Sequence, residues 1–196
     1  MAKVNIHGSW DDVYRNNPVN KLPWYIKGLD FDLKNELKKL KKGSFLDLGT
    51  GPGTQAIALS KMGFKVTGTD ISSTAIDKLK KQKSSVIFLK DDILKTKLKK
   101  KFDYILDRGI FHVFKPKSRK SYIKNVKNLL NNKGILFLKC FSIKEKNKEG
   151  PYRFSKKQIK NYFNKDFKVK IIKDSVFHST LDKDPKALFV VMEKNK

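Results

Sequence analysis

Three closely spaced glycines follow a short apolar stretch in SFLDLGTGPGTQAIALSKMG, residues 44–63. Glycine lets a backbone approach a ligand closely, and the helix pattern that follows would add a partial positive charge, so a bound phosphate is the first hypothesis. The dinucleotide fingerprint, however, requires glycine where Thr54 stands, and no P-loop lysine follows. Asp47 also enters the turn, and its carboxylate repels a pyrophosphate and attracts a cation. The turn of Gly49 and Gly51 therefore favours a cationic ligand.

Two more carboxylates end neighbouring strand patterns. Asp70, followed by Ile71, ends the second apolar run, and Asp92, followed by Ile93, comes after the third. Ligands of open α/β sheets bind beyond the carboxyl ends of the strands, where Asp70 would accept hydrogen bonds from ribose hydroxyls and Asp92 from an adenine amino group. Each acid alone could be an ordinary helix cap. Their shared location favours a nucleoside that carries a cationic group.

Apolar β-rich runs alternate with amphipathic helix patterns, which predicts a mostly parallel sheet with helices on both faces. The strand patterns span residues 44–49, 65–70, 85–91, 102–109, 134–141, 168–177 and 186–194, and the helix patterns 54–62, 72–83, 117–134 and 155–163. We expect the third helix to stop at Gly134 and the fourth to begin with a capping box of Ser155 and Gln158. The last two strands are joined by HSTLDKDP, which is too short for a crossover helix, so they should form an antiparallel hairpin.

Two further helices should precede the sheet. Residues 8–17 read as a short helix capped by Ser9, with Asp12 three residues on, and residues 31–42 as an amphipathic helix. The aromatic side chains of Trp10, Tyr14 and Trp24 fit equally well a cover over the sheet edge or a place in the core. We expect a single domain over residues 1–196, in which residues 1–42 supply helices and a lid and residues 43–196 form a Rossmann-like core of seven strands.

Composition limits the class of protein. The chain has 196 residues, of which 39% are hydrophobic, enough for one sizeable core. The N-terminus lacks the pattern of a signal peptide, and no apolar run is long enough to cross a membrane, so we expect a soluble cytoplasmic protein, with a monomer favoured. The single cysteine, Cys140, excludes an internal disulfide and a cysteine-based metal cage. A buried strand thiol is favoured over a nucleophile there, and no metal site is expected.

The net charge of +26 allows two interpretations. A strongly basic chain is typical of proteins that bind nucleic acid. Only four of the basic residues are arginines, however, and the lysines alternate with leucines along several segments, as on solvated helix faces. We favour the solvated surface, which would still bind polyanions weakly and without specificity.

These features together resemble those of a known family. The turn LDLGTGPG, the strand-end Asp70, the DDI after the third strand and the terminal hairpin are similar to the class I S-adenosylmethionine-dependent methyltransferases. Within that superfamily, SWDDVY followed by PW, ILDRGIFHVF, and the tail GPYRFSKKQI…VFHSTLDKDPKALFVV resemble the thiopurine S-methyltransferase and tellurite-resistance methyltransferase branch. The resemblance implies S-adenosylmethionine as cofactor, S-adenosylhomocysteine as product, and a set of cofactor contacts: Asp47, Gly49 and Gly51 at the methionine moiety, Asp70 and Ile71 at the ribose, Asp92 and Ile93 at the adenine, and Trp10, Tyr14 and Trp24 near the lid.

The residues after the fourth strand, where the superfamily places its substrate-facing groups, are the candidates for catalysis. Asp107 and His112 could accept a proton if the acceptor must lose one. Asp107 could instead pair with Arg108, and His112 could be a packed residue of the following turn. By the same resemblance Arg108, Arg153 and His178 lie on the substrate side, and Arg153 would suit an anionic substrate group.

Three functions remain open from the sequence. The leading hypothesis is methyl transfer to a small-molecule nucleophile: a thiol, a chalcogen, an amine or a hydroxyl. The second is an RNA or DNA methyltransferase that uses the basic surface, and the third is a nucleoside-binding protein without catalysis. The chain has DRGIF after the fourth strand instead of the Asn/Asp-Pro-Pro-aromatic turn typical of enzymes that methylate exocyclic base amines. This difference favours the small-molecule acceptor.

Overall fold

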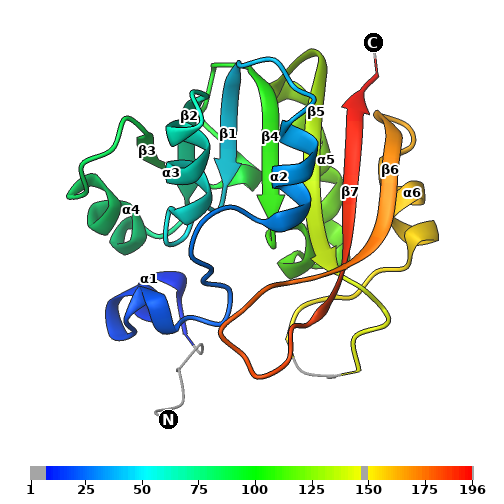
Figure 1. The fold of residues 1–196 in the computed structure, drawn as a ribbon. Helices are drawn as coiled ribbons and strands as arrows, with labels where there is room; N and C mark the ends of the chain where they lie inside the picture. Colours follow the sequence, from blue (N-terminus) through cyan, green and yellow to red (C-terminus); the bar gives the residue numbers. More distant parts are fainter. Residues whose placement is uncertain (1–7, 147–149, 196) are drawn as a thin grey trace.

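The computed structural model describes residues 8–146 and 150–195 and contains one mixed sheet (Figure 1). Within this part of the chain the sheet has seven strands in the order β3-β2-β1-β4-β5-β7-β6. The strands are β1 (Ser44–Leu48), β2 (Lys65–Asp70), β3 (Ile87–Lys90), β4 (Phe102–Arg108), β5 (Leu130–Phe141), β6 (Phe167–Val176) and β7 (Lys186–Lys194). β1 to β5 run parallel, whereas β7 pairs antiparallel with both β5 and β6. The expected Rossmann-like sheet and its antiparallel hairpin are confirmed.

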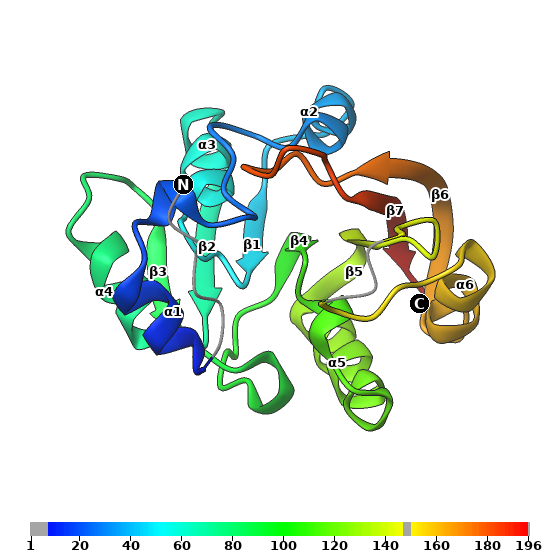
Figure 2. The ribbon, with the colours of Figure 1, turned by 90° about the horizontal axis from the view of Figure 1, so that it is seen from below.

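Helices cover both faces of the sheet (Figure 2). The α-helices are α1 (Trp10–Asn16), α2 (Phe31–Leu37), α3 (Thr54–Lys61), α4 (Ser73–Lys80), α5 (Pro116–Leu129) and α6 (Lys156–Phe163), with 3₁₀ turns η1 (Val19–Lys21), η2 (Ile93–Lys95) and η3 (Phe111–Val113). One apolar core lies under α5 and α6, and a second lies under α2, α3 and α4. These two cores hold the strands rigidly, so the loops at the strand ends have a fixed base.

Local sequence signals explain where several helices begin. Ser9 and Asp12 form the expected capping box of α1, and Ser155 and Gln158 that of α6. Ser72 caps α4 by accepting a hydrogen bond from the backbone N–H of Ala75. Such caps satisfy backbone donors that have no partner inside the helix. They fix the start of α4 directly behind Asp70, at the end of β2.

The boundary between α5 and β5 differs from the expectation. The helix ends at Leu129, not at Gly134, and β5 already pairs with β4 at Leu130. The pairing register shifts between Phe102 and Tyr104 on β4, and Lys133 adopts a left-handed φ of 59°. The side chain of Asn131 donates to Asp103 on β4. These non-local contacts end the helix before the glycine does.

The carboxyl ends of the five parallel strands meet at one edge of the sheet, and the N-terminal segment with α1 lies against that edge (Figures 1 and 2). α1 packs on α4, and the loop between β6 and β7 reaches the N-terminal segment, where the backbone N–H of Thr180 donates to the carbonyl of Pro23. The N-terminal segment with α1 and the loop between β6 and β7 therefore both border this edge. Among the described residues, no helix is long and apolar enough to cross a membrane.

Candidate functional site

The glycine turn after β1 adopts a conformation that other residues avoid. Gly49 and Gly51 have φ angles of +61° and +50°. A side chain at Gly51 would place its Cβ 2.5 Å from the Tyr14 hydroxyl, and one at Gly49 would place it 2.0 Å from Cδ1 of Ile110. Because only glycine tolerates both the φ angles and the contacts, the turn can pack closely against the N-terminal segment and the β4 turn.

Asp47 lies at the base of this turn and is 2% exposed. Its Oδ2 accepts a hydrogen bond of 2.7 Å from the Thr50 hydroxyl. Burial raises the pKa of Asp47 to about 7, and the charge of Asp70 acts in the same direction. No salt bridge reaches Asp47 in the described part of the chain, so a positively charged ligand would stabilise its ionised form.

Asp70 ends β2 and faces the same turn. Its two oxygens accept hydrogen bonds of 2.9 Å from the backbone N–H groups of Gly51 and Ser72. Burial raises its pKa, although these two bonds oppose the shift. Each carboxylate oxygen keeps a further lone pair, which suits ribose hydroxyls. Ile71 follows with 47% of its surface exposed and offers an apolar contact beside it.

Asp92 and Ile93 differ in how open they are. Asp92 Oδ1 caps η2 by accepting from the backbone N–H of Leu94 at 2.9 Å. The described residues show no hydrogen bond to its Oδ2, which leaves that atom available to an adenine amino group. Ile93 is 7% exposed and packs in the core under α5. Its expected contact with adenine stays a prediction, and the more exposed Ile71 presents the larger apolar surface.

The N-terminal aromatic residues form a cover of their own. The indole N–H of Trp24 donates to the hydroxyl of Tyr14 at 3.2 Å, and the rings of Trp10 and Trp24 lie 5.7 Å apart. Tyr14 is 4% exposed, and Trp10 is 42% exposed. Tyr14 packs with Val13, Leu22 and Ala75 in a small cluster outside the two main cores. The geometry therefore favours the cover over the core, and a lid role for this segment stays a prediction.

Asp107, the first candidate for catalysis, organises the turn after β4. Its Oδ1 accepts from the backbone N–H groups of Gly109 and Ile110, and its Oδ2 from that of Phe111 and from the Tyr122 hydroxyl. Asp107 is fully buried, and burial raises its pKa to about 6. The alternative interpretation held that Asp107 pairs with Arg108, and the described part of the structure shows no such pair. With both oxygens occupied, the carboxylate shapes the turn and is poorly placed to remove a proton.

His112, the second candidate, is buried in η3 with 6% of its surface exposed. The backbone N–H of Phe141 donates to its Nδ1 at 3.1 Å, so the neutral ring carries its proton on Nε2. Burial and the charges of Arg108 and Arg153 lower its pKa to about 3. His112 is thus a neutral hydrogen-bond donor near Gly109, not a base: its Nε2 lies 3.4 Å from where a Cβ of Gly109 would be.

Arg108 belongs to a buried charge network that sequence reasoning missed. Its Nε pairs with Asp30 at 3.0 Å, and the Lys139 ammonium lies 2.8 Å from the same carboxylate and 2.9 Å from Asp32. Arg108 also donates to the carbonyls of Trp24 and His178. The network therefore ties the N-terminal segment, β4, β5 and the β6–β7 loop together. A lysine inside the apolar run GILFLKCF was the one signal for it.

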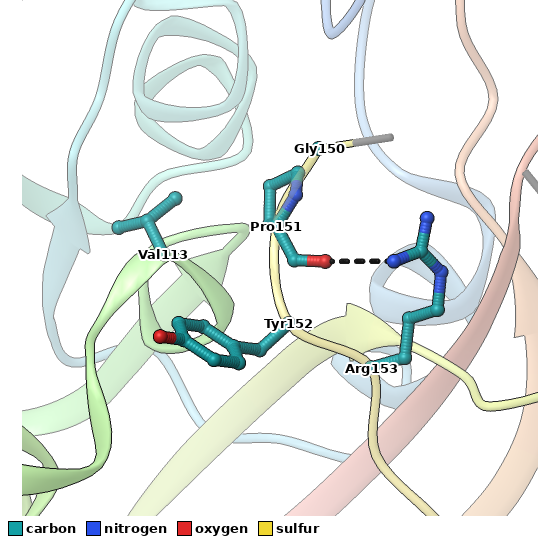
Figure 3. Close-up of a pocket in the computed structure, with 5 residues that line it drawn as sticks. All are labelled: Val113, Gly150, Pro151, Tyr152 and Arg153. Carbon is teal, nitrogen blue, oxygen red and sulfur yellow. Dashed lines mark hydrogen bonds between the residues drawn. The ribbon is translucent and has the colours of Figure 1, made fainter. Parts of the chain in front are cut away.

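A cavity of about 470 Å³ lies beside η3 and is lined by Val113, Gly150, Pro151, Tyr152 and Arg153 (Figure 3). The backbone N–H of Tyr152 donates to the carbonyl of His112, which places the cavity next to the β4 turn. Arg153 lines this cavity and donates to the Pro151 carbonyl at 3.2 Å, and its expected contact with the substrate stays a prediction. The His178 side chain is half exposed and bonds Asp184, 2.7 Å away, and it is not among the residues that line the cavity.

The remaining sequence expectations concern the thiol and metals. Cys140 is fully buried in β5, and burial raises its pKa, as the favoured interpretation of a strand thiol required. Over residues 8–146 and 150–195, no three histidine, cysteine, aspartate or glutamate side chains are grouped so that they could hold a metal ion.

Comparisons with known proteins agree with this geometry. Residues 45–134 match the family described as "Methyltransferase domain". An uncharacterised methyltransferase of Schizosaccharomyces pombe is 33% identical over 129 residues, which cover 61% of this chain and 88% of the relative. A probable thiol methyltransferase of Arabidopsis thaliana is 31% identical over 126 residues, which cover 61% of this chain and 56% of the relative. A solved structure described under the conversion of a disulfide bond into a thioacetal group during echinomycin biosynthesis aligns with a TM-score of 0.80 and 22% identity, over 95% of this chain and 90% of that one.

The site residues fit the cofactor of this family. The glycine turn tolerates no side chain at Gly49 or Gly51, Asp70 offers lone pairs to ribose hydroxyls, and Asp47 is a buried carboxylate whose ionised form a sulfonium would stabilise. The chain belongs to the S-adenosylmethionine-dependent methyltransferases.

Proposed function

We propose that the protein transfers the methyl group of S-adenosylmethionine to a small thiol, which binds in the cavity beside η3. The observation that carries this proposal is the state of the two groups after β4: both oxygens of Asp107 are occupied by the turn, and His112 is a neutral donor. The acceptor must therefore ionise without help from either group.

In this proposal, the side chains at the sheet edge each bind a different part of the cofactor. Asp70 would hold the ribose hydroxyls, the free oxygen of Asp92 the adenine amino group, and Asp47 would lie near the sulfonium. When bound, the cofactor supplies a methyl carbon already activated by the sulfonium charge. The protein then has to align the acceptor with that carbon and exclude water, and the Tyr14 and Trp24 cover suits the second task.

The acid–base properties of possible acceptors decide between them. A thiol has an ordinary pKa near 8.5, so a few per cent is already thiolate at pH 7, far more than for an alcohol. An alcohol needs a base to be a nucleophile, and the described residues around Gly109 offer none that is free: Asp107 is bonded four times, and His112 has its lone pair on Nδ1 engaged. Asp47 has a suitable pKa, but it is 2% exposed and its Oδ2 already accepts from the Thr50 hydroxyl. The acceptor proton is lost to solvent before transfer.

Electrostatics around the cavity favour an anionic acceptor. Arg153 lines the cavity, and the charges of Arg108 and Arg153 are felt at His112, where they lower its pKa. The same positive potential would stabilise a thiolate and lower the pKa of a bound thiol. The names of two similar proteins, a thiol methyltransferase and an enzyme of disulfide-to-thioacetal conversion, support sulfur as the accepting atom.

The test is methyl transfer from labelled S-adenosylmethionine to thiols whose pKa values differ, measured from pH 6 to 9, with the matching alcohols and amines as controls. We expect transfer to the thiols alone, and the pH at half-maximal kcat/KM should follow the pKa of each thiol. A midpoint that is the same for every thiol would mean that a group of the protein takes the proton. Transfer to alcohols, amines or bulk tRNA but not to thiols would overturn the proposal.

Two further parts of the proposal concern the location of the protein in the cell and its oligomeric state. The expected cytoplasmic location and monomeric state would be checked by fractionation of the source cells and by light scattering. Either result leaves the choice of acceptor unaffected, because the site described above is built from one chain.

A further inference from the structure

Arg119, in the first turn of α5, is a buried cation without a buried anion beside it. It is 5% exposed, and no salt bridge reaches it in the described part of the chain. Burial of an unpaired guanidinium costs free energy unless other groups replace its hydration.

Aromatic rings take the place of a carboxylate. The guanidinium carbon lies 4.6 Å from the ring centroid of Tyr152, 4.7 Å from that of Phe154 and 5.2 Å from that of Tyr162. A fourth ring, that of Phe111, lies at 5.9 Å. Ring faces attract a cation, and the attraction is stronger where water is excluded. Arg119 is therefore enclosed by an aromatic cage.

The hydrogen bonds of the guanidinium point to separate segments. Its Nε donates to the carbonyl of Phe114 at 3.1 Å, just after η3, and one terminal nitrogen donates to the Tyr162 hydroxyl of α6 at 2.6 Å. The other terminal nitrogen is buried and has no hydrogen-bond partner among the described residues. A lysine would keep the charge but could not make the flat contacts and both bonds at once.

The cage joins the two walls of the cavity. Val113, on one wall, lies in the chain between Phe111 and Phe114, which both contact Arg119. Tyr152, on the other wall, stacks on the guanidinium. These walls come from η3 and from the segment after residue 149, nearly forty residues apart in the chain. Arg119 is thus placed to set the distance between them.

We propose that Arg119 is a positioning residue for the methyl acceptor: it holds the Tyr152 wall against η3 and so fixes the width of the acceptor cavity. This inference rests on the proposed function, because that proposal assigns the cavity to the acceptor. Arg119 touches neither acceptor nor cofactor. Its loss should loosen the acceptor site and leave the cofactor site, on the other side of β4, unchanged.

The experiment compares Arg119→Met and Arg119→Lys with Lys120→Met, which removes the same charge from an exposed neighbour on α5. We expect Arg119→Met to lower kcat/KM for the thiol about 10-fold or more, mainly through KM, because a displaced wall misaligns the acceptor. Arg119→Lys should show a smaller effect of the same kind. The dissociation constant of S-adenosylhomocysteine should stay within about twofold of the wild type in all three variants.

Amide exchange supplies a measurement that needs no acceptor. Exchange in residues 150–154 should be faster in Arg119→Met and Arg119→Lys than in Lys120→Met, with exchange in β1 and β2 unchanged. If the thiol KM is unaffected while only the melting temperature falls, Arg119 is a structural residue and the inference is wrong. If Arg119→Met does not fold, Arg119→Lys decides by the same measurements. If the wild type methylates no thiol, the proposed function fails, and unchanged exchange in residues 150–154 would overturn the inference separately.

Discussion

Asp47 shows how one buried carboxylate links the cofactor to pH. Its pKa is raised to about 7 because burial disfavours its charge. The unfolded chain loses this proton near pH 4, whereas the folded protein keeps it until about pH 7. The folded state thus binds more protons in between, so the contribution of Asp47 to the free energy of unfolding is largest below pH 4 and is lost as the pH rises through 7.

Asp47→Asn should remove the free-energy cost of ionising this buried carboxylate. It should also weaken cofactor binding. We expect the ligand-free variant to be more stable than the wild type by up to about 4 kcal/mol at pH 8, since its neutral amide needs no ionisation. In the wild type the affinity for S-adenosylmethionine, relative to neutral-sulfur S-adenosylhomocysteine, should rise from pH 6 to 8, because the cation favours the carboxylate. Calorimetry and chemical denaturation across this range check both points.

Asp77→Asn is the matched control, because it makes the same change at an exposed position of α4. It should alter neither the pH dependence nor the affinity ratio. A wild-type ratio that does not change with pH would show that Asp47 does not lie near the sulfonium.

At the scale of elements, one side chain of α1 makes three hydrogen bonds to the start of α4. Oδ1 of Asp11 accepts hydrogen bonds from the hydroxyl of Ser72 at 2.7 Å, that of Ser73 at 3.2 Å and the backbone N–H of Thr74 at 2.8 Å. The bond from Thr74, followed by that from Ser72, lowers the pKa of Asp11. A carboxylate of α1 thus binds the N-terminus of α4, where the helix dipole favours negative charge. The start of α4 follows Asp70 directly, so the cover and the ribose site share an element.

Asp11→Ala should therefore release the cover without unfolding the sheet. We expect faster amide exchange in α1 and a cofactor affinity weaker by about 1 kcal/mol, the usual cost of a lost helix cap. Hydrogen exchange with and without S-adenosylhomocysteine, together with calorimetry, would measure this. Asp77→Ala, which removes a carboxylate from α4 away from α1, should behave as the wild type. Equal affinities of Asp11→Ala and the wild type would mean that residues 9–24 are not a lid.

At the scale of the whole molecule, the net charge of +26 determines how the protein binds polyanions. The salt bridges that the structure shows involve few of the lysines, and Lys194, partly buried, has its pKa lowered by burial and by Lys101 and Lys127. Crowded like charges of this kind attract phosphate backbones without reading sequence.

We expect tRNA to bind with the same affinity as an unrelated RNA of equal length. Binding should weaken at least 10-fold between 50 and 200 mM salt, because phosphate contacts release counterions. Filter binding at several salt concentrations checks this, with heparin as a competitor that carries charge but no bases. Methyl transfer to a single RNA position at physiological salt would contradict the choice of a small-molecule acceptor.

The sequence by itself determined the order of the strands and helices and placed the glycine turn and the carboxylates Asp47 and Asp70 at one edge of the sheet. Glycine spacing, strand-end carboxylates and helix caps are local signals, since each depends on residues a few positions apart, and the hairpin followed from a short connection. The ends of two helices were wrong: α2, expected over residues 31–42, ends at Leu37, and α5 ends at Leu129, where the contact of Asn131 with Asp103 overrides a local stop signal.

Only the tertiary structure decided what the residues after β4 do. Asp107, Arg108 and His112 stand close together in the sequence, yet their states depend on Tyr122, Asp30 and the backbone of Phe141. Arg108 and Asp30 are 78 positions apart, and Lys139 and Asp30 are 109 apart. The chain alone cannot show which donors will saturate a carboxylate or fix a tautomer, because burial and partners come from strands that meet only in the folded sheet.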